Sequence, residues 1–131
     1  MTQRYRTNAG AIFSLKYHIV WCPKYRRKVL NAPIDDRLRQ IITEVANEHN
    51  MIVHALEIMP DHVHLFIEAD PTLAVAEIVN RIKGRSSRVL RREFSSLRTR
   101  LPTLWSRSYY AGSVGHVSAE TVQKYIENQK S

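Results

Sequence analysis

Two β-prone runs joined by a two-residue turn constrain the fold of this chain more than any other feature. The first run is Met51–Met59 and the second is His62–Glu68. Pro60 and Asp61, which separate them, are typical turn residues. Strands with so short a connection pair in antiparallel fashion. The sequence therefore predicts a β-hairpin within an antiparallel sheet.

Strand and helix patterns alternate along the rest of the chain. Apolar residues recur at every second position over residues 12–22 and at helical spacing over residues 35–49. Asp35 is a candidate cap for that first helix. Residues 1–10 are expected to be loose, and residues 95–107 to form a basic, irregular connection. The expected strands are 12–22, 51–59, 62–68 and 108–114, and the expected helices are 35–49, 71–94 and 118–129.

The order of these elements, β-α-β-β-α-β, is that of the ferredoxin-like split βαβ arrangement with one helix added at the end. We therefore expect an α+β fold with an antiparallel sheet, formed by a single domain over residues 1–131. In this topology the first and third strands occupy the centre of the sheet. His62 and His64 would then lie on a central strand, which is a rigid support for a site.

The charge of the chain indicates its kind of partner. Twenty Lys and Arg against twelve Asp and Glu leave a net charge of +8 and a pI near 10.0, which favours nucleic acid first and a membrane surface second. No apolar run is long enough to cross a bilayer, and we expect a cytoplasmic protein without a membrane partner. The single cysteine, Cys22, allows no internal disulfide and excludes a cysteine-rich zinc site.

The pattern His62-Val63-His64 is a candidate metal site. Residues two apart on a strand project to the same face, so the imidazoles would stand side by side while Val63 enters the core. Paired imidazoles can hold one divalent cation. With six His in 131 residues, chance alone gives roughly a quarter of such a pattern per chain. Two surface histidines at a hairpin edge are therefore the competing interpretation, and Asp61 is expected chiefly as a turn residue.

A second candidate lies in the last helix, where Tyr125 and Gln129 are four residues apart and share one face. Taken alone, Tyr125 is better explained by packing, and Gln129 by exposure to solvent. On the first strand, His18 could approach the histidine pair if the first and third strands are neighbours.

Two basic segments are candidates for contact with nucleic acid. In the first, an aromatic side chain lies among cations, as suits stacking on an unpaired base. In the second, the positive charge is not balanced by acids nearby in the sequence, which favours phosphate contact over a merely solvated face. The candidate residues are Lys24, Tyr25, Arg26, Arg27, Lys83, Arg85 and Arg88.

Several segments, taken in order, give a specific resemblance that covers nearly the whole chain from about Leu15 onward. They are Tyr17–Arg26, Met59–His64, Ile82–Ser87, Leu104–Trp105, Tyr109–Tyr110, Ser113–Gly115 and Tyr125–Gln129. In these segments the chain resembles the small single-tyrosine HUH transposases of minimal bacterial and archaeal insertion sequences, which move as single-stranded DNA.

The resemblance implies a role for each candidate. Tyr125 would be the nucleophile, and His62, His64 and Gln129 would bind Mg²⁺ or Mn²⁺. The protein would cleave and rejoin single-stranded DNA through a 5′-phosphotyrosine intermediate and would recognise DNA hairpins. It would act as a homodimer, in which active sites in trans can combine the histidine pair of one subunit with the tyrosine helix of the other.

Two other functions compete with this interpretation. One is a non-catalytic module that binds single-stranded RNA or DNA, because basic ferredoxin-like sheets often do so. The other is a related HUH nuclease, either a domesticated enzyme that processes palindromes or a replication-initiation nuclease. A binding module would have no need of His62, His64 and Tyr125 together.

Overall fold

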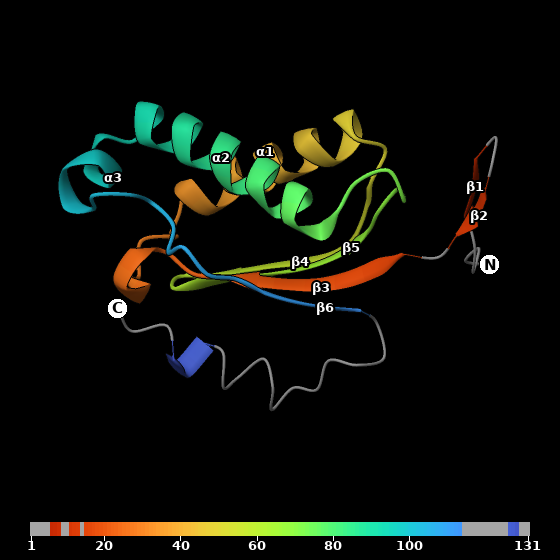
Figure 1. Cartoon of the computed structure of the whole chain (residues 1–131). Helices are drawn as coiled ribbons and strands as arrows, with labels where there is room; N and C mark the ends of the chain where they lie inside the picture. The colour runs from red at the N-terminus through yellow and green to blue at the C-terminus, as the bar shows by residue number, and fades with distance from the viewer. Residues whose placement is uncertain (1–5, 9–10, 14, 114–125, 129–131) are drawn as a thin grey trace.

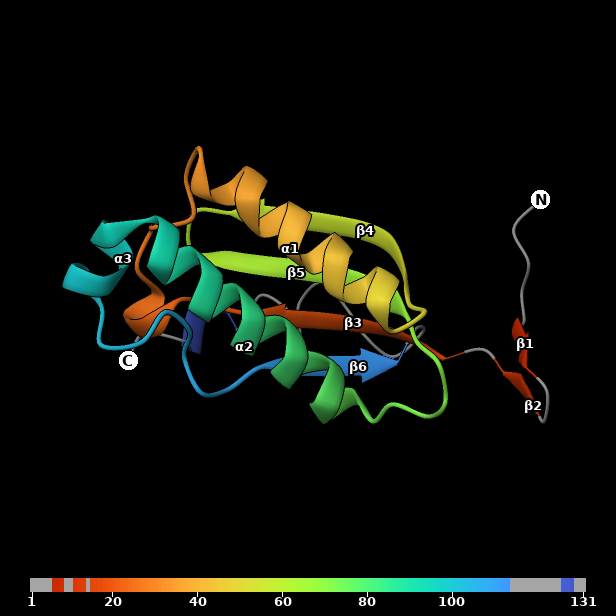
Figure 2. The same cartoon turned by 90° about the horizontal axis from the view of Figure 1, so that it is seen from above.

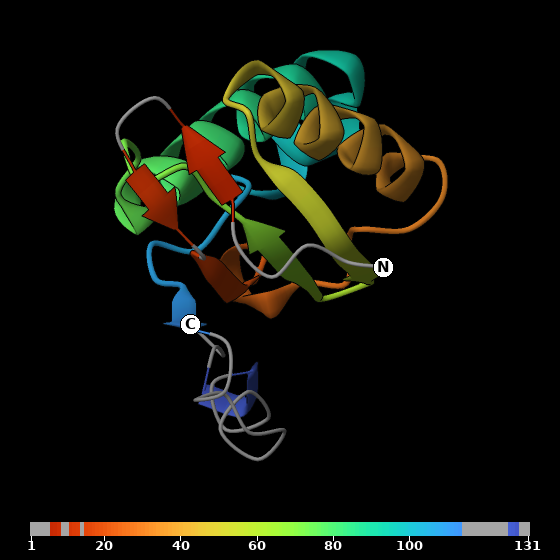
Figure 3. The ribbon, with the colours of Figure 1, turned by 90° about the vertical axis from the view of Figure 1, so that its right-hand side faces the viewer.

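An antiparallel sheet with helices on one face forms the body of the protein (Figure 1). The computed structural model describes residues 6–8, 11–13, 15–113 and 126–128. Within those residues, the main sheet has four strands in the order β4-β5-β3-β6, and a separate two-stranded sheet pairs β1 with β2. Figures 1 and 2 show this small sheet beyond one end of the main sheet, and Figure 3 shows it from that end.

The bounds of the elements follow the sequence patterns closely. The strands are β1 (Arg6–Asn8), β2 (Ala11–Phe13), β3 (Lys16–Trp21), β4 (Ile52–Met59), β5 (His62–Glu68) and β6 (Tyr110–Ser113). The helices are the 3₁₀ turn η1 (Lys24–Arg26) and the α-helices α1 (Ile34–Glu48), α2 (Val75–Glu93) and α3 (Ser95–Arg100).

The expected fold class is confirmed. Strands β3, β4, β5 and β6 are the four strands of the ferredoxin-like pattern in chain order, and β3 and β5 are central as predicted. All three pairings in this sheet are antiparallel: β4 with β5, β5 with β3, and β3 with β6. Seen from above, α1 and α2 lie side by side across the sheet (Figure 2).

Alternation along the central strands explains which face the helices cover. Val63, Leu65 and Ile67 of β5 are fully buried, while His62, His64 and Phe66, which alternate with them, are only partly buried. Ile41 and Val45 of α1 are likewise fully buried in the core between the layers. Burying each such side chain contributes about 1.5–3 kcal/mol before the entropy cost of ordering it. The opposite face of β5 therefore carries the two histidines together with Phe66.

Some expected elements differ from the structure. The alternation at 12–22 belongs to two strands, β2 and β3, because a period of two reports which face a residue takes and not which partner its strand has. Residues 6–8, expected to be loose, pair with β2. Residues 95–107 contain α3, whose six residues are too few to show helical periodicity.

Asp35 does not cap α1. The helix begins at Ile34, and Asp35 lies in its first turn, where its carboxylate accepts a hydrogen bond from the Asp36 amide. Of the expected last helix, residues 126–128 are helical, and its start at Ser118 lies outside the described residues. Among the residues that are described, no helix is both long and apolar enough to span a membrane.

Candidate functional site

The candidate site lies on the sheet face opposite α1 and α2. His62 and His64 project from this face of β5, so the prediction that they share one face of a central strand is confirmed. On β3, Val20 is paired with His64 and His18 with Phe66. Glu57 of β4 lies opposite His64 on the other side. The pair is therefore flanked by ordered strands on both sides.

His18 approaches the pair as expected from neighbouring central strands. Its Nδ1 atom lies 3.0 Å from Nε2 of His64, and their ring centroids are 5.2 Å apart. The His18 ring also stacks on Phe66, with centroids 4.7 Å apart and an interplanar angle of 19°. Burial, together with the neighbouring His18, lowers the pKa of His64. His64 is therefore a neutral imidazole at neutral pH, as a metal ligand must be.

Asp61 does more than form the turn. One of its carboxylate oxygens lies 2.9 Å from Nδ1 of His62, and the other accepts a hydrogen bond of 2.9 Å from Nε of Arg26. Burial raises the pKa of Asp61, but the hydrogen bonds from His62 and Arg26 outweigh it and leave the pKa below its usual value. A carboxylate that accepts from Nδ1 keeps the lone pair of His62 on Nε2, where a cation could bind.

Arg26 also reaches the C-terminal segment. Its Nη1 atom donates a hydrogen bond of 2.9 Å to the backbone oxygen of Ile126, whose side chain is buried. Figure 1 shows residues 126–128 on the side of the sheet away from α1 and α2. Tyr125 and Gln129, the other two residues predicted for the site, lie outside the described residues.

The histidine pair fits a divalent cation in its donor chemistry. Two imidazoles are good ligands for a transition metal such as Mn²⁺, and neutral ligands leave the charge of the ion available for a phosphate. A small cleft beside the pair is lined by His18, Ala55, Glu57, His64 and Phe66. Over the part of the chain that is described, no group of three or more His, Cys, Asp or Glu residues is arranged to hold a metal. A complete site needs a further ligand.

The first basic segment presents an aromatic ring to solvent. Tyr25 is 45% exposed, and the ammonium group of Lys24 lies 5.2 Å from the centre of its ring. Arg27 is exposed beside them. Arg26, by contrast, is turned toward Asp61 and Ile126. The sequence could not distinguish the two arginines, because they are adjacent in one basic run and the direction of each side chain depends on the fold.

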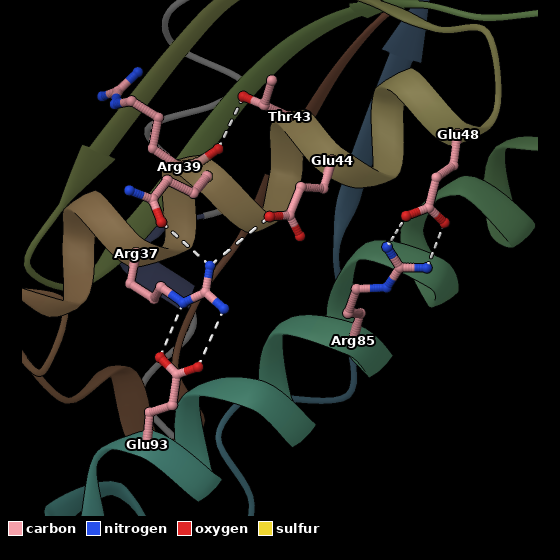
Figure 4. Close-up of polar contacts among 8 residues, drawn as sticks. Arg37, Arg39, Thr43, Glu44, Glu48, Arg85 and Glu93 are labelled. Carbon is pink, nitrogen blue, oxygen red and sulfur yellow. Dashed lines mark hydrogen bonds and ion pairs between the residues drawn. The ribbon is translucent and has the colours of Figure 1, made fainter.

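The second basic segment is partly engaged within the protein. The guanidinium of Arg85 forms a two-armed ion pair with Glu48, which joins α2 to α1 (Figure 4). The acid that balances Arg85 is not near it in the sequence but 37 residues away, so the fold pairs a charge that the sequence shows as unbalanced. Burial lowers the pKa of Lys83, whose ammonium donates to the backbone oxygen of Ser106 at 2.7 Å. Arg88 is exposed.

Fold and site together define a class of protein, and comparison with known families identifies it. The chain belongs to the family described as IS200-like transposases, whose sequence model matches residues 11–129. It is accordingly a DNA-processing enzyme of transposition.

Individual relatives agree with this assignment. The chain is 37% identical to the ISDra2 transposase TnpA of Deinococcus radiodurans over 122 residues, which cover 92% of this chain and 87% of the relative. It is 31% identical to the transposase of insertion sequence IS200 of Salmonella typhimurium over 119 residues, 89% of this chain and 78% of the relative.

Solved structures show the same fold. A crystal structure of a candidate transposase from Deinococcus radiodurans superposes with a TM-score of 0.88 and 34% identity, covering 96% of this chain and 98% of the other. A REP-associated tyrosine transposase bound to a REP hairpin superposes with a TM-score of 0.59 and 13% identity, covering 93% and 68%. The second likeness concerns the fold alone.

Proposed function

We propose that this transposase cleaves and rejoins single-stranded DNA at the ends of an insertion sequence through a 5′-phosphotyrosine intermediate at Tyr125. The observation that carries the proposal is the placing of Ile126, the residue after Tyr125, against an arginine that also binds Asp61 beside His62. Ile126, which adjoins the proposed nucleophile in the sequence, therefore lies on the same sheet face as the histidine pair.

The proposed reaction conserves the energy of the phosphodiester bond. The phenolate oxygen of Tyr125 attacks phosphorus, the bond from phosphorus to the 3′-oxygen breaks, and that oxygen leaves as a 3′-hydroxyl after taking a proton. A free 3′-hydroxyl then attacks the phosphotyrosine, which releases the tyrosine and joins the strands. The free phenol has a pKa near 10, so it needs help to lose its proton at neutral pH.

The proposed metal ligands are His62, His64 and Gln129, and the ion is Mg²⁺ or Mn²⁺. Such an ion would polarise the scissile phosphate and offset the charge that develops on the leaving oxygen. Asp61 holds the His62 ring with its Nε2 lone pair available, and the lowered pKa of His64 keeps that imidazole neutral. The imidazoles favour Mn²⁺ over Mg²⁺ for measurements in vitro.

The proposed substrate is single-stranded DNA that carries hairpins. A fold neighbour is described as bound to a REP hairpin, and the exposed Tyr25 with Lys24 and Arg27 suits stacking on an unpaired base beside phosphates. We further propose a homodimer with active sites that can form in trans. Within one chain, Arg26 contacts the backbone of Ile126, and the same contact made between two subunits would form the active site in trans.

The test is to incubate the protein with labelled hairpin DNA and Mn²⁺ and to look for an adduct that survives denaturation. Tyr125→Phe should abolish the adduct and leave DNA binding intact, whereas Tyr109→Phe, the matched control, should keep both. His62→Ala should abolish cleavage. An adduct formed by Tyr125→Phe would disprove the assigned nucleophile. Tight binding with no cleavage by the unaltered protein would favour the non-catalytic binding module.

A further inference from the structure

We infer that Arg26 is a positioning residue that holds two parts of the site in register: the His62 ring, through Asp61, and the backbone beside Tyr125, through Ile126. The consequence for the reaction depends on the function proposed above, whereas the contacts do not. The sequence predicts that Arg26, like its neighbours, contacts DNA, whereas in the structure its side chain is turned toward Asp61 and Ile126.

The guanidinium of Arg26 makes two directed hydrogen bonds to different parts of the chain. Nε donates to Oδ2 of Asp61 and Nη1 to the oxygen of Ile126, each at 2.9 Å. The side chains of Arg26 and Asp61 are only 28% and 14% exposed, so water competes weakly for these bonds. The planar fork of arginine presents its donors in a fixed geometry, which the single ammonium of a lysine cannot reproduce.

The two carboxylate oxygens of Asp61 bind different partners. Oδ1 lies 2.9 Å from Nδ1 of His62, and Oδ2 accepts from Arg26. A carboxylate held at both oxygens has a fixed orientation, and so has the imidazole that donates to it. Removing Arg26 would leave the orientation of His62 to Asp61 alone and would free the oxygen of Ile126.

The backbone of η1 is arranged to aim this side chain. Tyr25 and Arg26 have positive φ angles of 59° and 52°, a conformation that is unfavourable for residues other than glycine. Backbone hydrogen bonds secure the turn: the Lys24 amide donates to Leu104 and the Arg26 amide to Pro23, both at 2.8 Å. Strained residues persist where surrounding structure fixes them, often at functional sites. The turn therefore exposes Tyr25 while it directs Arg26 inward.

The test compares Arg26→Gln and Arg26→Lys with Arg27→Gln, a matched control at the exposed neighbour. Two measurements on the full chain need no catalysis: Mn²⁺ affinity without DNA, and amide hydrogen exchange of a peptide spanning residues 126–128. Arg26→Gln should weaken Mn²⁺ binding about 10-fold, as loss of a partner to a metal ligand does. It should also speed exchange about 5-fold or more.

Arg26→Lys discriminates between positioning and charge. Because the lysine keeps the positive charge but not the fork, it should show the same two defects while its affinity for hairpin DNA stays near that of the unaltered protein. Arg27→Gln should lose DNA affinity and leave Mn²⁺ binding and exchange unchanged. Wild-type Mn²⁺ affinity and exchange in Arg26→Lys would overturn the inference.

Asp61→Asn provides a second variant in case Arg26→Gln fails to fold. It should weaken Mn²⁺ binding to a similar extent, and adding Arg26→Lys to it should cause little further loss, since both changes break one network. Fully additive losses would contradict the inference. An adduct retained by Tyr125→Phe would instead refute the proposed nucleophile and leave these Mn²⁺ and exchange results standing.

Discussion

His18 and His64, on neighbouring central strands, are joined by a hydrogen bond of 3.0 Å between Nδ1 of the first and Nε2 of the second. Whichever ring donates, the Nε2 atom of His64 is engaged by His18. A cation that binds through that nitrogen must displace His18 from it. His18 is therefore placed to compete with the proposed metal, and its stacking on Phe66 holds the ring in that position.

His18→Phe should consequently tighten Mn²⁺ binding in the absence of DNA. Phenylalanine keeps the stacking on Phe66 and removes one hydrogen bond, whose net value of about 0.5–1.5 kcal/mol corresponds to about a 2- to 10-fold gain in affinity. Titration of Mn²⁺ followed by electron paramagnetic resonance measures this, with His49→Gln as the control. Weaker binding would show instead that His18 is itself a ligand.

The sequence predicted those parts of the fold that depend on local pattern. β5 has the predicted bounds, since alternation and a preceding Pro-Asp turn define it together. α1 differs by one residue at each end, and α2 begins at Val75, four residues later than expected. Neighbouring strands followed from the order of elements, which also predicted the approach of His18 to His64.

The partners of long polar side chains could not be predicted. Arg26, Lys83 and Arg85 all appear in the sequence as basic residues in basic surroundings, yet each is bound to a group far along the chain. Such contacts depend on tertiary packing, which neither charge nor periodicity reports. The roles of Tyr125 and Gln129 stay predictions, since they rest on resemblance and lie outside the described residues.

The ion pair of Arg85 with Glu48 should serve the fold more than DNA binding. Both arms of the guanidinium are directed at the carboxylate of α1 (Figure 4), so Arg85→Ala should lower the melting temperature and change DNA affinity little. Arg88→Ala, the exposed control on the same helix, should reduce the slope of log affinity against log salt by about 0.7, the value of one single-strand phosphate contact. Equal slopes for the two variants would mean that Arg85 also contacts DNA.

Lys83 should stabilise the connection that leads into β6. Its ammonium donates to the backbone oxygens of Ser106 at 2.7 Å and of Ser108 at 3.4 Å. Lys83→Met keeps the apolar stem and removes the donor, and after allowance for partial solvent exposure it should cost about 1–2 kcal/mol of unfolding free energy. Urea denaturation measures this cost, with Lys28→Met as the control at an exposed lysine. A cost no larger than that of Lys28→Met would refute the structural role.

Cys22 should be unreactive in the native protein, and its titration should lower the stability of the fold at alkaline pH. Its side chain is fully buried, and burial, aided by the Asp61 carboxylate, raises the pKa of the thiol from 9.0 to about 11. The unfolded state therefore loses this proton first, and stability falls as pH rises from 9.0 to about 11. The slope attributable to Cys22 is at most about 1.4 kcal/mol per pH unit.

Two measurements check this expectation. A thiol reagent such as Ellman's should label Cys22 slowly in native protein at about pH 8 and rapidly in guanidinium, because the reactive species is an accessible thiolate. The stability of Cys22→Ala should fall less steeply with pH than that of the unaltered protein over the alkaline range. Tyrosines and lysines also titrate there, but their contribution is the same in both proteins and drops out of the difference. Rapid native labelling would mean that the end of β3 opens readily, and parallel pH curves would show that the thiol titrates alike in both states.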